Sequence, residues 1–96
     1  FLKHTERGNL MAKYKILYWK DIPAQIKVFE GRRPISHPLP EIFQEEIDRI
    51  AMEQGILDTD KYLEHWHWTE GAEMPGTAVE VINALVKESI EKFPNL

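Results

Sequence analysis

The segment YKILYWK, residues 14–20, decides the fold of this chain. It is rich in β-branched and aromatic residues and lacks Gly and Pro, a composition that favours a β-strand. A second apolar run, IKVF at residues 26–29, follows closely enough to pair antiparallel with the first. Pro23 lies between the two runs, and it suits a turn because it has no N–H and a fixed φ. We therefore expect a β-hairpin with later segments covering one of its faces.

Successive side chains of a strand point to opposite faces. The simplest register places one set of apolar and aromatic side chains beneath the covering helices: Tyr14, Ile16, Tyr18, Ile26 and Val28. The other face then displays Lys15, Leu17, Trp19, Lys27 and Phe29. This second face mixes charge with apolar area, which indicates partial cover or contact with another molecule.

Two helices and a third strand are expected later in the chain. The first helix extends from about Pro40 to Gln54, where apolar residues recur at helical spacing. The second begins with a capping box formed by Thr77 and Glu80 and ends near Phe93. Between them, Asp58 caps a short turn, and HWHWT at residues 65–69 alternates as a strand does, with its tryptophans facing the core. The Pro-rich residues 32–40 and the Gly-bounded residues 71–76 are expected to be irregular.

This order, β-β-α-β-α, predicts the α+β class. We expect a three-stranded antiparallel sheet in the order 2-1-3, with both helices packed on one face. Residues 1–10 show no period and are expected to be a linker or the tail of an upstream segment. Residues 11–96 are expected to form a single domain.

Composition narrows the function classes. The 96 residues contain no cysteine, which excludes disulfides and thiolate chemistry and fits a cytoplasmic protein. The net charge of −4 hides an uneven distribution. Residues 11–35 carry six basic and two acidic side chains, whereas residues 36–96 carry four basic and thirteen acidic ones. The hairpin is therefore basic, as anion-binding surfaces are, although a solvated sheet face is also lysine-rich.

One candidate binding site combines the aromatic Trp19 with the charged residues that flank the hairpin: Lys20, Asp21, Arg32 and Arg33. We expect the charged residues to flank the same end of the hairpin or its exit. Two adjacent arginines in a Pro-bounded loop can hold a carboxylate or a phosphate with paired N–H donors. They can equally pair with acidic residues of the first helix.

A second candidate site is the pair His65 and His67, whose spacing on a strand points both rings the same way. Transition metals use such pairs with a third ligand, here His37, Glu64 or Glu70. Two exposed histidines are the simpler interpretation. The aromatic and basic open face also resembles a nucleic-acid platform, but the acidic balance opposes this. Catalytic motifs are absent, so enzyme activity and cofactors are not expected.

The chain resembles a known family at several motifs spread over residues 11–93. They are MAKY (11–14), WKDIPAQ (19–25), GRRP (31–34), PLP (38–40), Asp60-x-Tyr62-Leu63, Trp66-x-Trp68 and GTAVEV (76–81). These are similar to the bacterial "virulence factor" domain, which occurs alone and as the terminal domain of conserved virulence factor C type proteins. There it lies beside an iron–sulfur scaffold domain and HEAT-like repeats.

The resemblance implies an accessory or protein-interaction module, with a partner linked to iron–sulfur or other metal-cluster handling. It supplies no catalytic residue. Similar proteins often carry Arg at position 67, which argues against a metal role for His67. The alternative is a small anion-binding or metal-binding protein that uses Arg32 and Arg33, or His65 and His67.

Overall fold

The computed structural model describes residues 11–56 and 58–93. The expectations for residues 1–10 and for the chain beyond Phe93 lie outside the described residues. Five strands are present: β1 (Met11–Trp19), β2 (Ile22–Glu30), β3 (Arg33–Pro38), β4 (Trp66–Trp68) and β5 (Ala72–Pro75). The helices are α2 (Glu41–Glu53), α3 (Thr59–Glu64) and α4 (Ala78–Lys92).

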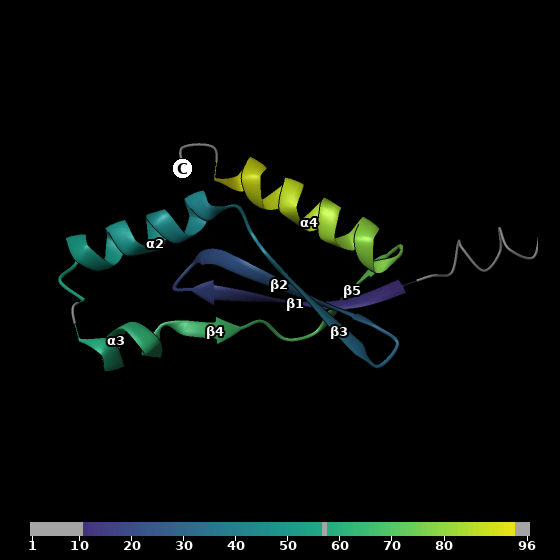
Figure 1. Cartoon of the computed structure of the whole chain (residues 1–96), viewed down its shortest axis with the longest axis horizontal. Helices are drawn as coiled ribbons and strands as arrows, with labels where there is room; N and C mark the ends of the chain where they lie inside the picture. The colour runs from purple at the N-terminus through teal and green to yellow at the C-terminus, as the bar shows by residue number, and fades with distance from the viewer. Residues whose placement is uncertain (1–10, 57, 94–96) are drawn as a thin grey trace, which may run out of the picture.

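The strands form one five-stranded antiparallel sheet in the order β3-β2-β1-β4, in which β5 also pairs with β1. Helices α2 and α4 lie together on the upper side of the sheet in Figure 1, and α3 lies below its left end. The α+β class and the adjacency of the three predicted strands (β2, β1 and β4) are confirmed. The prediction of only three strands is wrong, because residues 33–38 and 72–75 also pair.

Both additional strands are edge strands, where sequence signals are weakest. Pro34 and Pro38 lie four residues apart in β3, so their backbone nitrogens face the same way. Proline fits an edge strand when its missing N–H would face solvent. β5 pairs with Met11–Tyr14 of β1, and Thr69 bridges the gap between β4 and β5. The Thr69 N–H donates to the Ile16 carbonyl at 2.9 Å, and the Ile16 N–H donates to Thr69 Oγ1 at 3.0 Å.

Alternate residues of β1 and β2 build the core beneath α2 and α4. Ile16 is paired with Ile26 across the two strands, and both are buried, as is Val28. The helices contribute further buried side chains to the same cluster: Phe43, Ile47, Ala51, Val81, Ile82 and Leu85. The expected covered face is therefore confirmed for its three aliphatic residues. Tyr14 and Tyr18 are only half-buried.

The helix boundaries agree with their end signals. The capping box of α4 is complete, because Thr77 Oγ1 accepts from the Glu80 N–H at 3.3 Å and Glu80 Oε1 accepts from the Thr77 N–H at 2.9 Å. Pro40 and Gln54 flank α2 at its two ends. Asp58 caps α3 by accepting from the Asp60 N–H at 2.9 Å.

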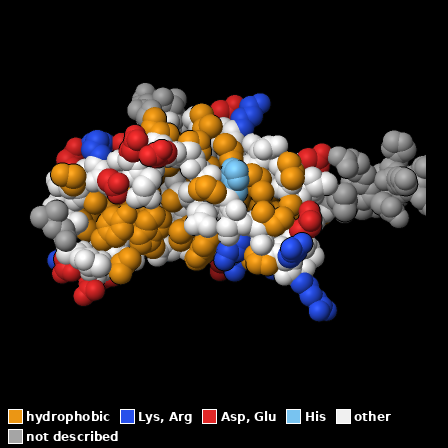
Figure 2. Space-filling view, in the orientation of Figure 1, with side chains coloured by type: hydrophobic (Ala, Val, Ile, Leu, Met, Phe, Trp, Pro, Cys, Tyr) orange, Lys and Arg blue, Asp and Glu red, His pale blue; other side chains and the backbone are white. Residues whose placement is uncertain are grey.

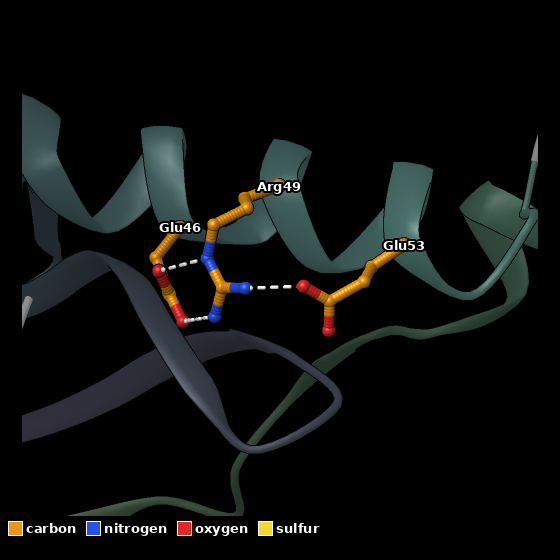
Figure 3. A network of polar contacts seen from close by, with 3 residues as sticks. All are labelled: Glu46, Arg49 and Glu53. Atoms are coloured by element: carbon orange, nitrogen blue, oxygen red, sulfur yellow. Dashed lines mark hydrogen bonds and ion pairs between the residues drawn. The ribbon is translucent and has the colours of Figure 1, made fainter.

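Arg49 neutralises part of the acidic outer surface of α2, because it forms ion pairs with two glutamates of the same helix (Figure 3). Arg49 Nε donates to Glu46 Oε1 at 2.9 Å, and Arg49 Nη1 donates to Glu53 Oε2 at 2.6 Å. The hydrogen bond from Arg49 lowers the pKa of Glu46 below its usual value. Glu46 and Glu53 are therefore paired within their own helix, and neither pairs with the arginines of the β2–β3 turn.

Candidate functional site: the open face of the sheet

The residues of the first predicted binding site do not meet. Lys20 and Asp21 form the β1–β2 turn, whereas Arg32 lies in the β2–β3 turn at the other end of β2. β2 has nine residues. At about 3.3 Å per residue, the two turns are separated by roughly 30 Å. The prediction of a single basic corner is wrong because the two turns lie at opposite ends of β2, which begins four residues before the apolar run at residues 26–29.

Trp19 is fully buried, with 0% of its surface exposed, so the prediction that it is displayed is wrong. Its Nε1 donates to the Tyr62 carbonyl of α3 at 2.9 Å. The Trp19 ring centroid lies 5.5 Å from that of Tyr62 and 5.4 Å from that of His65. Trp19 therefore anchors α3 to the sheet.

Lys20 is also used within the fold. Its φ of 55° lies in the left-handed region, which costs a non-glycine residue about 1–2 kcal/mol. The Lys20 N–H donates to the His65 carbonyl at 3.0 Å, and its ammonium donates to Gln54 Oε1. These contacts join the β1–β2 turn to the ends of α2 and α3, and they offset the strain.

The two histidines do not form a pair on one strand. His65 is the C-cap of α3 and lies outside β4, so the prediction that both rings point the same way is wrong. His65 contacts Trp19, whereas His67 stacks on Tyr18 with ring centroids 5.9 Å apart. Residues 11–56 and 58–93 contain no group of three His, Cys, Asp or Glu side chains placed to hold a metal ion. The third ligand that the metal hypothesis needs is therefore missing from the described chain.

The register of the sheet instead defines a different surface on the side away from α2 and α4, which we call the open face. Directly paired residues share a face, so the open face can be described as three rows across the strands. The first row is Glu73, Lys13, Phe29 and Pro34. The second row is Lys15, Lys27 and Ser36. The third row is Trp68, Leu17, Gln25 and Pro38.

The open face is positively charged at its centre. Lys15 and Lys27 lie directly opposite one another, an arrangement that destabilises a sheet. No carboxylate of the described residues forms an ion pair with Lys13, Lys15 or Lys27. Lys27 Nζ lies 4.7 Å from the centroid of the Trp68 ring. This cation–π contact partly compensates for the repulsion between Lys15 and Lys27. Figure 2 shows blue Lys and Arg side chains along the lower side of the sheet, away from α2 and α4.

Two hollows flank the central lysines. The basic hollow, of about 430 Å³, is lined by Met11, Lys13, Lys15, Phe29, Gly31 and Glu73. The apolar hollow, of about 420 Å³, includes Leu17, Gln25 and Pro38 of the third row, together with Trp66 and the start of α2. Arg32 and Arg33 are exposed but do not line either hollow, and Arg33 is paired with Glu30, whose side chain leaves the sheet on the face opposite to Phe29.

Sequence reasoning placed Lys15, Lys27 and Phe29 on this face correctly, but it misjudged Trp19, which is buried, and Trp68, which is partly exposed. Trp68 was expected in the core, yet it is 40% exposed and lies opposite Leu17. Trp66, in contrast, is half-buried, packs against the core cluster and contacts Tyr62, in agreement with the expectation. The signal that could have identified the face is the alternation of Lys13, Lys15 and Leu17 with the buried residues of β1.

Comparison with models of known protein families identifies the family of this chain. The model of the Virulence factor family matches residues 17–95, which is most of the chain. The chain belongs to the Virulence factor family. No curated protein and no solved structure matches it.

The match confirms the resemblance drawn from the sequence motifs. For this Virulence factor domain it indicates a family and no biochemical activity. None of the helices in the described part of the chain has the length and apolar character needed to cross a membrane.

Proposed function

We propose that this Virulence factor domain is an accessory protein-interaction module, and that its contact surface is the open face of the sheet. The partner that this face fits is an acidic protein surface. The observation that carries the proposal is the direct opposition of Lys15 and Lys27 without a carboxylate partner.

The folded domain gains nothing from placing two like charges opposite one another. A cross-strand pair of this kind costs a few tenths of a kcal/mol or more. An acidic partner would convert the same pair into a stabilising contact, and the local positive potential would raise the rate of association. The uneven charge distribution also supports this interpretation. The acidic side chains Glu46 and Glu53 of α2 are already paired with Arg49, so they do not neutralise the lysines of the open face.

The surroundings of the two lysines also suit a protein partner. Leu17 and Trp68 add apolar area beside them, and the apolar hollow continues that area toward α2. Protein interfaces combine such apolar area with a polar surround. Arg32 and Arg33, which the sequence indicated as binding residues, are exposed near the far end of β2 and are not part of the rows that define the open face.

A charge-reversal experiment tests the proposal. The Lys15→Glu, Lys27→Glu double variant is compared with Lys61→Glu, Lys87→Glu, which changes the net charge equally at exposed helix positions. Immobilised wild-type domain captures proteins from a lysate of the source cells, and each captured protein is then purified. Its affinity for the three domains is measured by calorimetry at low and at physiological salt.

The expected result is at least a tenfold loss of affinity for the open-face variant and little change for the helix variant, with wild-type binding weakened by salt. A tenfold loss corresponds to about 1.4 kcal/mol. Equal affinity of both variants for every captured protein would show that the contact surface lies elsewhere.

A further inference from the structure

The basic hollow has features that a flat protein contact does not need. Lys13 and Lys15 are two residues apart on β1, so their side chains leave the same face about 7 Å apart. Phe29 lies directly opposite Lys13 on β2, and Glu73 lies opposite Lys13 on β5. The hollow therefore has two cations at its centre, an aromatic ring on one side and a carboxylate on the other.

The hollow is an open depression in the surface, and its volume is sufficient for a small molecule. At about 430 Å³ it falls within the range of typical ligand pockets, which is about 300–1,000 Å³. Its lining is mixed, because Met11 and Phe29 contribute apolar surface beside the lysines. Methionine and aromatic rings together form an adaptable apolar floor.

The Lys13 side chain passes close to the backbone at Gly71. A Cβ atom at position 71 would lie 2.5 Å from Lys13 Cε, so the end of the lysine side chain would have to move if residue 71 carried a side chain. Gly71 does not have a positive φ, so its backbone conformation is one that other residues adopt. The absence of a side chain at position 71 therefore leaves room for the Lys13 side chain.

We propose that the basic hollow binds a small organic anion. Its carboxylate or phosphate group lies between the ammonium groups of Lys13 and Lys15, and its apolar body packs against Phe29 and Met11. Lys27, opposite Lys15, adds a third positive charge nearby. Glu73 accepts a hydrogen bond from a hydroxyl or amine of the ligand, or remains in solvent.

An organic anion fits the hollow better than an inorganic one. Inorganic phosphate would use the lysines but leave Phe29 and Met11 in contact with water. A neutral aromatic compound would use the apolar floor but leave the lysines unpaired. A ligand that carries both groups uses the whole lining, so its affinity should exceed that of either fragment.

The test is an NMR titration of the ¹⁵N-labelled domain with four probes: phenyl phosphate, phenylacetate, inorganic phosphate and phenol. We expect saturable shifts of the Lys13, Lys15, Phe29 and Glu73 amides with at least one of the first two probes, with a Kd of about 1 mM. The two fragments should bind several-fold more weakly. The preferred probe of the first two then identifies the anionic group as a phosphate ester or a carboxylate.

Three variants assign the binding to the hollow. Lys13→Met keeps the length of the side chain and removes its charge, and it should weaken binding at least threefold. Gly71→Ala should weaken binding similarly by displacing Lys13, with no change in thermal stability. Lys87→Met on α4 is the matched control and should bind as wild type does.

No saturable shift with either organic anion up to ~10 mM would overturn the proposal. Equal binding by the Lys13→Met and Lys87→Met variants would overturn it as well. Neither outcome bears on the acidic-partner proposal, which is tested at Lys15 and Lys27 with a captured protein. The two conclusions can therefore fail separately.

Discussion

The two faces of the β1–β2 pair are built from alternating residues of the same strands, yet they differ in almost every property. Ile16 and Ile26 lie opposite one another and are buried beneath α2 and α4. One residue earlier and later along the chain, Lys15 and Lys27 lie opposite one another on the open face. The buried pair stabilises the fold, whereas the lysine pair opposes it. The requirements of folding account for the buried pair but not for the lysine pair, and the proposed contact with an acidic partner would account for the second.

The buried Trp19 and the partly exposed Trp68 test this contrast most strongly. Trp19→Ala should destabilise the domain by about 3–5 kcal/mol, because a fully buried indole and its hydrogen bond to Tyr62 are lost. Trp68→Ala removes the same side chain from the open face and should cost less than about 1 kcal/mol. Urea denaturation of both variants measures the difference. Similar losses for the two variants would mean that the open face is part of the core.

Neighbouring residues of β2 provide a second comparison. Ile26→Ala should lower the free energy of unfolding by about 2–4 kcal/mol, because Ile26 has 0% exposure in the covered core. Lys27→Ala should change it by less than about 0.5 kcal/mol. Thermal and urea unfolding of the two variants measure both values. A large loss in Lys27→Ala would contradict the assignment of faces.

The smallest expected change in the free energy of unfolding is a gain in stability, whereas the two comparisons above concern losses. Lys15→Glu replaces a repulsive pair with an attractive one opposite Lys27 and should stabilise the domain by about 0.2–1 kcal/mol. High salt should reduce this gain, because it screens exposed charges. Lys61→Glu on α3 is the control and should be close to neutral. Destabilisation by Lys15→Glu at low salt would show that the two lysines do not lie opposite one another.

The elements that sequence reasoning predicted well are those with local signals. The helix that begins after Thr77 has a capping box, and the helix that begins after Pro40 has a stripe of apolar residues and a glycine just beyond its end. Both boundaries agree with the structure to within about one residue. The β1–β2 hairpin and the strand at Trp66–Trp68 were also expected from their composition and alternation.

The missed elements depend on contacts between distant residues. β3 contains Pro34 and Pro38, which argue against a strand unless it lies at an edge. β5 has four residues and is defined by its pairing with the start of β1. Nothing in the local sequence shows that pairing.

The candidate site was predicted in part for the same reason. Lys15, Lys27 and Phe29 follow from strand alternation, so the sequence places them on one face. The burial of Trp19 follows from the position of α3, which local patterns do not define. The distance between Lys20 and Arg32 follows from the full length of β2, which extends four residues before the apolar run at residues 26–29.

The most direct test of the open face is a set of NMR distance measurements on the lysine side chains. Lys27 Nζ lies 4.7 Å from the Trp68 ring centroid, so the Lys27 methylene protons should show nuclear Overhauser effects to the indole and upfield ring-current shifts. Lys15 and Lys27 should show none to Phe43 or Leu85, which are buried among the helices. Contacts from either lysine to Phe43 or Leu85, or unshifted Lys27 methylenes, would contradict the account.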